Sequence, residues 1–418
     1  MIINEHKIEE TVSSKEVSSL IDWLSQYGYD SEGGITRLLY TNDWLEAQEG
    51  LKQLINRKGF HTYYDEVGNL FGRLGGSTFK DETILTGSHI DTVVNGGKFD
   101  GQLGIIGGIL AIEYLNKKFG KPLRNIEVVS MAEEEGSRFP YTFWGSRNIV
   151  GTVKKEVVED LIDMDGIRFI DAMRNVGFEF KDEDNTGRND IKAFIELHVE
   201  QGGVLEIEQK SIGIVEHIVG QKRFTIEVTG QSNHAGTTPM GYRRDALYCV
   251  SKMISEIMDL TISYGDPLVA TVGSIEVIPN TSNVVPGKVV FSLDIRHIDE
   301  GIMTKYTDEV ISRLQSIASK MELNIKVNNY MDCLPIVMDS NLVNKIIDSC
   351  ERKGLNYKLM HSGAGHDSQI FAKTIPTAMI FVPSHDGISH SPMEFTETKD
   401  LIEGIKALIE TLYCLAYK

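Results

Sequence analysis

Residues 84–118 read ILTGSHIDTVVNGGKFDGQLGIIGGILAIEYLNKK, and this stretch decides the fold class. The apolar run that ends at His89 is typical of a buried strand, and the apolar segment after Gly101 is typical of a helix. A further apolar run leads to Glu133–Glu135 and predicts a second strand. A strand, a helix and a strand in this order favour parallel pairing through a right-handed crossover. We therefore expect an α/β fold with a mixed, mostly parallel sheet and flanking helices.

Four apolar runs lead to side chains that bind divalent metals. Two of them precede His89 and Glu133–Glu135, and the runs AFIEL and AMIFVP precede His198 and His390. Open α/β sheets bind their ligands beyond the carboxyl ends of parallel strands, so these side chains are expected to meet at one edge. Imidazole and carboxylate groups suit zinc, manganese, cobalt or nickel. The sequence therefore predicts a metal site at this edge of the sheet.

The residues around the predicted site suggest separate roles. Asp91 follows His89 by two positions, where a carboxylate can accept the other N–H of a metal-binding imidazole. Asp100 lies in a glycine-rich loop that can fold its carboxylate back toward His89. The carboxylates of Glu133–Glu135 would repel one another unless bound cations balance their negative charge. One glutamate could then be a metal ligand and a neighbouring one a general base. Taken alone, the His89–Asp91 pair and the single histidines are more typical of structural residues, and the three glutamates could form a solvated acidic loop, but the complete set favours a metal site.

Composition limits the partners of this chain. Its 418 residues predict two domains, or one domain that carries an insert. The formal net charge of −18 disfavours binding to nucleic acid or to an anionic membrane. The N-terminal sequence MIINEHKIEE lacks the pattern of a signal peptide, and the four cysteines have no paired spacing. We therefore expect a cytoplasmic protein with reduced thiols.

The strand and helix pattern changes after His198. Alternating apolar residues predict antiparallel strands over 211–233 and 268–299, and helical spacing predicts helices over 243–263 and 301–321. These elements form an α+β (ferredoxin-like) insert, which we assign to residues 213–327. The strand leading to His390 follows the insert. The main domain is therefore expected to be discontinuous, with segments 1–212 and 328–418.

Several segments resemble a known family. They are GSHIDTVVNGGKFDGQLG, AEEEGSRF, ELHVEQG, SNHAGTTPMGYRRDA, PNTSNVVPG, SGAGHD and GISHSP, which begin at residue 87 and follow the order of the family. This set is similar to the amidohydrolase branch, or hydantoinase-type amidases and carbamoylases, of the dinuclear-metal aminoacylase and carboxypeptidase superfamily. Members of the branch hydrolyse allantoate, N-carbamoyl-L-amino acids, β-ureidopropionate or ureidoglycolate. The stretch MAEEEGSRFPYTFWGSRNI most resembles the members that act on allantoate.

The resemblance implies a catalytic domain that holds two divalent ions, Mn²⁺ or Zn²⁺, with Co²⁺ or Ni²⁺ as alternatives. By matching motifs, the first ion is expected on His89, Asp100 and His198, and the second on Asp100, Glu135 and His390. Glu134 is expected to be the general base, which takes a proton from the attacking water and returns it to the leaving amine. Asp91 is expected to support His89 from behind.

The resemblance also assigns the binding of a small ureido acid and the role of the insert. Residues expected to contact substrate are Gln221, His234, Asn283, Arg296, Gly363 and Ala364. Among them, His234 is expected to stabilise the developing oxyanion from the other subunit of a homodimer. The insert would then serve dimerisation and act as a lid. His366, Asp367 and His385 have no clear role in sequence.

Three alternatives remain open from sequence. The implied activity is hydrolysis of one ureido group of allantoate, which yields ureidoglycine, ammonia and carbon dioxide during purine breakdown. An N-carbamoyl-L-amino acid hydrolase, or a ureidoglycolate or β-ureidopropionate hydrolase, would share the same metal residues. A binding protein without activity would be expected to lack a ligand or the base, and neither is missing. The SGAGHD and SNHAGTTP segments disfavour a metallopeptidase.

Overall fold

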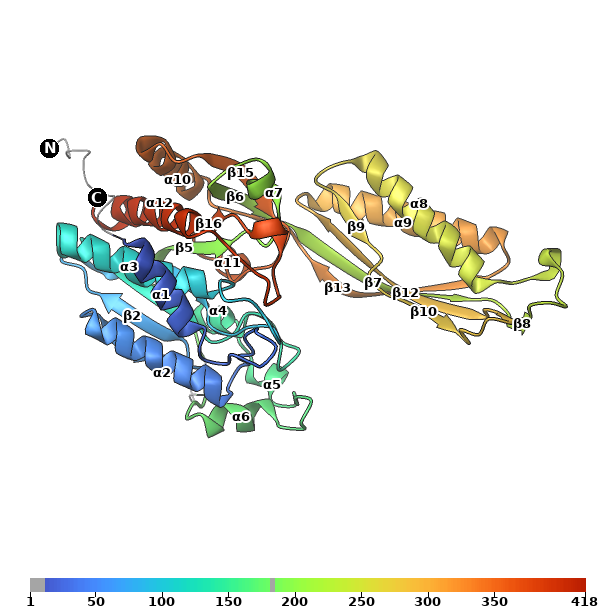
Figure 1. The fold of residues 1–418 in the computed structure, drawn as a ribbon, viewed down its shortest axis with the longest axis horizontal. Coiled ribbons are helices and arrows are strands. Elements are labelled where there is room, and N and C mark those ends of the chain that lie inside the picture. The colour runs from blue at the N-terminus through green and yellow to red at the C-terminus, as the bar shows by residue number, and fades with distance from the viewer. Residues whose placement is uncertain (1–11, 181–184) are drawn as a thin grey trace. The chain divides into compact units, whose positions relative to one another are not determined.

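The computed structural model describes residues 12–180 and 185–418 and divides the chain into two compact units (Figure 1). The first unit consists of the segments up to Glu216 and from Val337 onward, and His217–Ile336 form the second unit. The segment MIINEHKIEE, in which the sequence predicts no signal peptide, lies outside the described residues. Among the described residues, no helix is both long and apolar enough to cross a lipid bilayer.

Both ends of the second unit differ from the boundaries that we placed at 213 and 327. β6 (Ile212–Ile218) pairs with β16 (Thr377–Val382) of the large sheet, so most of this strand belongs to the first unit. β13 (Asn324–Cys333) pairs with a strand of the small sheet along its whole length, so the second unit extends beyond 327. Strand periodicity reports burial but not the sheet to which a strand belongs, so the sequence pattern could not place either junction.

The first unit is built on a nine-stranded mixed sheet. Its four central strands are parallel and lie in the order β4 (Arg124–Met131), β3 (Phe79–His89), β5 (Ile191–Val199) and β16. The remaining strands are β1 (His61–Tyr64), β2 (Leu70–Leu74), β6, β14 (Ile336–Val337) and β15 (Tyr357–Ser362). β2 pairs antiparallel with β4, and β6 pairs antiparallel with β16. The expected α/β fold with a mixed, mostly parallel sheet is therefore confirmed.

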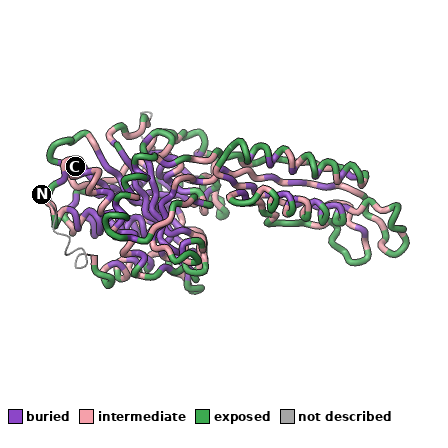
Figure 2. Tube along the Cα trace, turned by 90° about the horizontal axis from the view of Figure 1, so that it is seen from above, coloured by how far each residue is buried: buried purple, intermediate pink, exposed green. Residues whose placement is uncertain are grey.

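Helices cover both faces of this sheet. On one face lie the contacting helices α1 (Ser14–Leu24), α3 (Gln102–Phe119), α10 (Ser340–Lys353) and α12 (Thr398–Ala416), and α2 (Asn42–Arg57) packs on β1 and β2. Thr86 points toward α3, whereas its neighbour Leu85 joins a separate core with α4 (Trp144–Ile149) and α11 (Ser368–Phe371). Successive strand residues point to opposite faces, so β3 is buried on both sides. In Figure 2 the buried residues of the first unit gather at its centre.

The second unit has a five-stranded antiparallel sheet. Its strands are β7 (Gly220–Thr229), β9 (Val269–Thr271), β10 (Ile275–Ile278), β12 (Lys288–His297) and β13. Residues of β12 alternate between buried and partly exposed, and the buried ones pack against α8 (Ala246–Tyr264) and α9 (Glu300–Lys320). The short strands β8 (Asn233–His234) and β11 (Val284–Val285) form a separate ribbon. This unit is the α+β insert that the alternating pattern indicates.

Candidate active site

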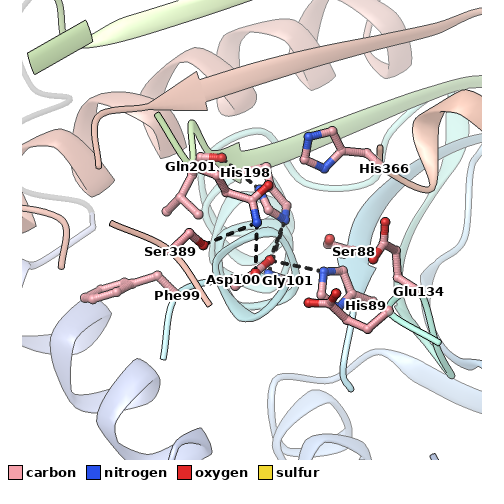
Figure 3. A network of polar contacts seen from close by, with 12 residues as sticks. Ser88, His89, Phe99, Asp100, Gly101, Glu134, His198, Gln201, His366 and Ser389 are labelled. Atoms are coloured by element: carbon pink, nitrogen blue, oxygen red, sulfur yellow. Dashed lines mark hydrogen bonds and ion pairs between the residues drawn. The ribbon is translucent and has the colours of Figure 1, made fainter. Parts of the chain in front are cut away.

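Asp100 lies between two histidines from neighbouring strands (Figure 3). His89 is the last residue of β3 and His198 lies near the end of β5, so parallel pairing brings the two imidazoles to the same edge of the sheet. Oδ1 of Asp100 lies 3.3 Å from Nε2 of His89 and 3.1 Å from Nε2 of His198. All three side chains are buried. The structure therefore brings together the three residues that we expected to bind the first ion.

Backbone carbonyls orient both imidazoles toward Asp100. Nδ1 of His89 lies 3.0 Å from the carbonyl oxygen of Asp91, and Nδ1 of His198 lies 2.9 Å from the carbonyl oxygen of Val199. These contacts place the ring hydrogen on Nδ1 and leave the lone pair of Nε2 directed at the candidate site. The Asp91 carboxylate, which we expected to support His89, lies slightly farther from its Nδ1, at 3.3 Å.

The second expected set lies on the other oxygen of Asp100. Oδ2 of Asp100 is 3.2 Å from Nε2 of His390, which is 3.4 Å from Oε1 of Glu135. His390 is half-exposed, with 49% of its side-chain surface accessible, whereas the histidines of the first set are buried. Two of the four strands that lead to candidate ligands end before the ligand is reached. β16 ends at Val382, before His390, and β4 ends at Met131, before Glu135. Loops therefore place His390 and Glu135.

The consecutive glutamates occupy different environments. The Asp91 carboxylate accepts hydrogen bonds from the backbone N–H groups of Glu134 at 2.9 Å and Glu135 at 3.1 Å. The Glu133 carboxylate accepts the backbone N–H of Gly136 and therefore faces its own loop. Oxygens of Glu134 and Glu135 lie within 4.8 Å of one another and of a His89 nitrogen. Glu134 is thus beside the two ligand sets, as expected for a base that is not itself required as a ligand.

The electrostatics of the site are dominated by buried carboxylates. Burial raises the pKa of the Glu134 carboxyl well above its ordinary value, and the negative charge of Glu135 raises it further. Burial and the charge of Asp100 raise the pKa of Glu135 to about 7. Burial also acts to raise the pKa of Asp100, but hydrogen bonds from His198, His390 and His89 hold that pKa well below its usual range. Divalent cations would stabilise this concentration of negative charge.

The sequence matches the model of peptidase family M20/M25/M40 over residues 85–413, which include all of the candidate ligands. The chain belongs to the M20 family. The family resemblance inferred from the motifs is thereby confirmed.

Relatives within the M20 family match nearly the whole chain. An allantoate amidohydrolase of Escherichia coli (strain K12) is 50% identical over 402 residues, which cover 96% of this chain and 98% of the relative. An N-carbamoyl-L-amino-acid amidohydrolase of Pseudomonas sp. (strain NS671) is 34% identical, over 96% of this chain and 98% of the relative. A solved amidase of the hydantoinase/carbamoylase family from Burkholderia multivorans superposes with a TM-score of 0.93 at 32% identity and covers 98% of this chain and 99% of that chain.

M20 enzymes are metal-dependent and have a dinuclear site, and the donors of this chain fit two divalent ions. In each expected triad, the nitrogen and oxygen donors lie within 4.8 Å of one another. The two oxygens of Asp100 face different triads, which is the arrangement that a bridging carboxylate requires. Imidazole and carboxylate donors suit zinc or manganese.

Two of the residues expected to contact substrate lie side by side in the second unit. Gln221 on β7 is paired across the sheet with Arg296 on β12. Both side chains donate hydrogen bonds to the carboxylate of Asp294. The donor atoms are Nε2 of Gln221, at 2.8 Å, and Nε of Arg296, at 3.0 Å. Nε of Arg223 also donates to Asp294, at 2.9 Å. Asp294 therefore organises a cluster with two guanidinium groups and one carboxylate, and our sequence interpretation did not include it.

The other two expected residues of this unit lie at the opposite end of the sheet. His234 pairs with Val284 in the β8–β11 ribbon, and the carbonyl of Asn283 accepts the N–H of Ala235. The ribbon adjoins Lys288, the first residue of β12. Arg296 lies at the other end of β12, one position before its last residue. Ten strand residues span about 30 Å. Within one chain, the structure therefore separates His234 and Asn283 from Gln221 and Arg296, which the linear motifs did not reveal.

The glycine-rich turn after β15 is organised by Ser362. Its hydroxyl donates to the carbonyl of Ala364 at 2.9 Å and accepts the N–H of the same residue at 3.2 Å. Nε2 of His366 lies 3.0 Å from this hydroxyl, and its ring packs against His198 with centroids 4.6 Å apart. His366 thus connects the turn at Gly363 and Ala364 to a candidate metal ligand. Its neighbour Asp367 is fully buried.

His385, whose role the sequence left open, lies on the surface. Its Nδ1 is 2.7 Å from Oε1 of Glu206, and both side chains are exposed to solvent. The pair therefore connects α7 (Val204–Ile207) to the 3-10 turn His385–Gly387 in the first unit and does not belong to the buried candidate site.

Two residues that our sequence interpretation did not select contact the candidate ligands. Nε2 of Gln201 donates to Oδ2 of Asp100 at 2.9 Å and lies 3.3 Å from Nε2 of His390. Glu394 accepts the backbone N–H of Asp100 at 3.1 Å. Gln201 lies within the quoted motif ELHVEQG and Glu394 follows the motif GISHSP, but neither has a residue type and spacing that by itself indicates a metal site.

Proposed function

We propose that this chain is an allantoate amidohydrolase. Such an enzyme adds one water molecule to a ureido group of allantoate and releases ureidoglycine, ammonia and carbon dioxide. The proposal of a metal-dependent reaction is supported above all by Asp100, whose two oxygens face two separate ligand triads. The 50% identity to the Escherichia coli allantoate amidohydrolase supports the choice of substrate.

The reaction requires a group that moves a proton beside the ligands. Bound divalent ions would polarise the ureido carbonyl and make water a stronger acid and nucleophile. Glu134 is suited to take the proton of the attacking water, because it adjoins both triads while Asp91 fixes its backbone. The protonated carboxyl can then return the proton to the nitrogen that leaves. Burial favours this neutral form, since it raises the pKa of Glu134.

Four of the proposed substrate contacts, Gln221, His234, Asn283 and Arg296, belong to the second unit. The planar guanidinium of Arg296 suits the carboxylate of allantoate, and Gln221 can bond to a neighbouring amide. His234 is exposed and can donate a hydrogen bond to a developing oxyanion, an interaction worth about 10²- to 10³-fold in rate. One small substrate cannot span the roughly 30 Å between these two groups. A homodimer, in which the partner subunit supplies His234 and Asn283, resolves this separation.

Subunit mixing tests the shared site. Glu134→Gln and His234→Ala subunits are each expected to be inactive, but a mixture that exchanges subunits would contain dimers with one intact site. Recovery of about a quarter of wild-type activity is the statistical expectation for equal, random mixing, since half of the dimers are mixed and each has one of two sites. Mass spectrometry of the intact dimers confirms the exchange. No recovery in a mixture with proven heterodimers would contradict the shared site.

A comparison of substrates tests the proposed activity. Protein stripped of metal and reloaded with Mn²⁺ or Zn²⁺ is assayed for ammonia release from allantoate and from N-carbamoyl-L-amino acids. We expect kcat/KM to favour allantoate by at least roughly tenfold with the preferred ion. The reverse preference would instead support the N-carbamoyl-L-amino acid hydrolase, the activity named for the relative at 34% identity.

We assign the enzyme to purine-nitrogen recovery, because allantoate is a product of purine breakdown. We also propose that the second unit acts as a lid. A cytoplasmic location is supported by the four cysteines, all of which are free thiols. Metal analysis of protein purified without added metal would decide between manganese and zinc.

A further inference from the structure

Glu394 connects the loops that carry Asp100 and His390. The side chain is buried, although the residue lies in a connecting segment before α12. Its Oε1 accepts the backbone N–H groups of Phe99 at 2.8 Å and Asp100 at 3.1 Å. Its Oε2 accepts the hydroxyl of Ser389 at 2.8 Å. A single carboxylate thus fixes two segments that are about 290 residues apart in sequence.

The loop around Asp100 is shaped to admit this carboxylate. A Cβ atom on Gly97 would lie 2.3 Å from both Cδ and Oε1 of Glu394, which is closer than real contacts allow. Glycine at this position therefore permits the approach of the carboxylate. Gln201 adds a second connection, because its Nε2 donates to Oδ2 of Asp100 at 2.9 Å and to Oγ of Ser389 at 3.3 Å.

The two ligand triads differ in what holds them together. His89 and His198 extend from β3 and β5, and the hydrogen bonds between these strands fix the register of the two histidines. His390 comes after β16 has ended at Val382, so sheet pairing does not set its position. The distance of 3.2 Å between Oδ2 of Asp100 and Nε2 of His390 therefore depends on contacts between loops.

We infer that Glu394 is a positioning residue that sets the metal affinity of the triad formed by Asp100, Glu135 and His390. The carboxylate does this by fixing the backbone of Asp100 relative to the loop of His390. The inference rests on the dinuclear site of the proposed function, and it predicts that the two ions respond differently to loss of Glu394. Groups that orient a ligand from behind typically contribute 10- to 100-fold to metal affinity.

Metal binding measures this role directly. Protein stripped of metal is titrated with Zn²⁺ in competition with a chromogenic chelator, and bound ions are counted by mass spectrometry of the native protein. Wild type is expected to bind two ions per chain. Glu394→Ala is expected to weaken one of them by about 10- to 100-fold and to leave the other within about twofold. Glu394→Gln, which retains the shape of the side chain, should shift the same ion in the same direction by less.

Glu200 provides a matched control. It is also buried, and its two oxygens accept the backbone N–H groups of Val204 at 2.8 Å and Leu205 at 2.9 Å. Neither of these partners carries a candidate ligand, so Glu200→Ala and Glu200→Gln should leave both affinities unchanged. Gly97→Ala is a second probe, because it displaces Glu394 without changing any charge. It is expected to weaken the same ion as Glu394→Ala.

The outcomes separate this inference from the proposed function. Unchanged affinities in Glu394→Ala would overturn the inference, as would equal weakening of both ions or an equal effect of Glu200→Ala. If Glu394→Ala does not fold, the same criteria apply to Glu394→Gln and Gly97→Ala. A wild-type protein that binds fewer than two ions would instead contradict the dinuclear site itself.

Discussion

The carboxylate of Asp91 accepts the backbone N–H of Glu134 at 2.9 Å. Its second oxygen accepts the N–H of Glu135 at 3.1 Å, so one side chain fixes both the proposed base and its neighbouring ligand. The carboxylate is fully buried and also approaches His89, which belongs to the other triad. Asp91 therefore couples residues from two loops that sequence spacing alone does not relate.

Asp91→Asn should reduce activity through misplacement of these groups. An amide keeps one acceptor oxygen but turns an N–H₂ group toward a backbone N–H, so one of the two hydrogen bonds is lost. We expect kcat to fall by about 10- to 100-fold, with weaker metal binding and little change in KM. Steady-state kinetics and metal titration measure the effect. A variant with wild-type kcat would show that the hydrogen bonds to the Asp91 carboxylate do not position Glu134.

Glu134→Gln should separate metal binding from turnover. The amide cannot accept and return a proton, so kcat should fall by about 10²- to 10⁴-fold while both ions remain bound. Glu135→Ala is the contrasting variant, since it removes a proposed ligand and should lower the metal content itself. Ion counts and ammonia release distinguish the two. Retention of more than a few per cent of activity in Glu134→Gln would exclude this residue as the general base.

Asp294→Asn should weaken binding of a carboxylate substrate. Asp294 aligns Arg296 and Gln221, so the substitution weakens the hydrogen bonds that hold both side chains in the binding geometry. We expect KM for allantoate to rise by roughly tenfold and kcat to change little. The matched control is Glu227→Gln on β7, which removes an exposed ion pair with Lys288. An equal rise in KM in both variants would point to general damage of the sheet.

The same variant should change the stability of the protein in acid. Burial acts to raise the pKa of Asp294, but hydrogen bonds and charges from Arg296 and Arg223 lower it below 3.8. The unfolded state therefore binds the proton more readily, so the stabilisation is complete above about pH 4 and is lost as the pH falls through the folded pKa. Chemical denaturation between pH 5 and pH 3 should show a weaker pH dependence in Asp294→Asn than in wild type. Identical slopes would contradict the lowered pKa.

Gly104→Ala should destabilise the first unit. A Cβ atom there would lie 2.6 Å from both the carbonyl oxygen of Leu197 and Cβ of Ser88, where α3 contacts the sheet. The contact on one side is backbone, which cannot move as a flexible side chain does. We expect the free energy of unfolding to fall by about 1–3 kcal/mol despite the better helix propensity of alanine. The control is Gly75→Ala, whose Cβ meets no atom within 4 Å and whose unfolding free energy should remain near wild type.

Local patterns predicted much of the fold. The apolar runs up to His89 and His198 are strands, and the segment after Gly101 is helix α3. These predictions succeeded because a buried strand and a buried helix each impose a residue pattern over many positions. The junctions of the insert differ from the predicted ones, because strand periodicity does not report that β6 and β13 belong to different sheets.

Residue chemistry likewise predicted which side chains belong to the candidate site, but not what holds them. His89, Asp100, Glu135, His198 and His390 are recognisable as donors by type and by motif. Gln201, Asp294 and Glu394 were not, because a hydrogen bond between distant segments leaves no periodic or spaced pattern in the chain. Most of their partners are between 71 and 295 positions away, and the others are two positions away on a strand or five positions away in a loop.

The sequence by itself determined the α/β class, the presence of an insert and the candidate metal-binding side chains, because burial periodicity, donor chemistry and family motifs are local properties. Only the tertiary structure decided that Asp100 directs one oxygen to each triad and that Asp91 and Glu394 fix the loops around it. It also separated Arg296, on the five-stranded sheet of the second unit, from His234, on the β8–β11 ribbon. These relationships depend on strand order, register and loop contacts, which arise only when distant segments pack together.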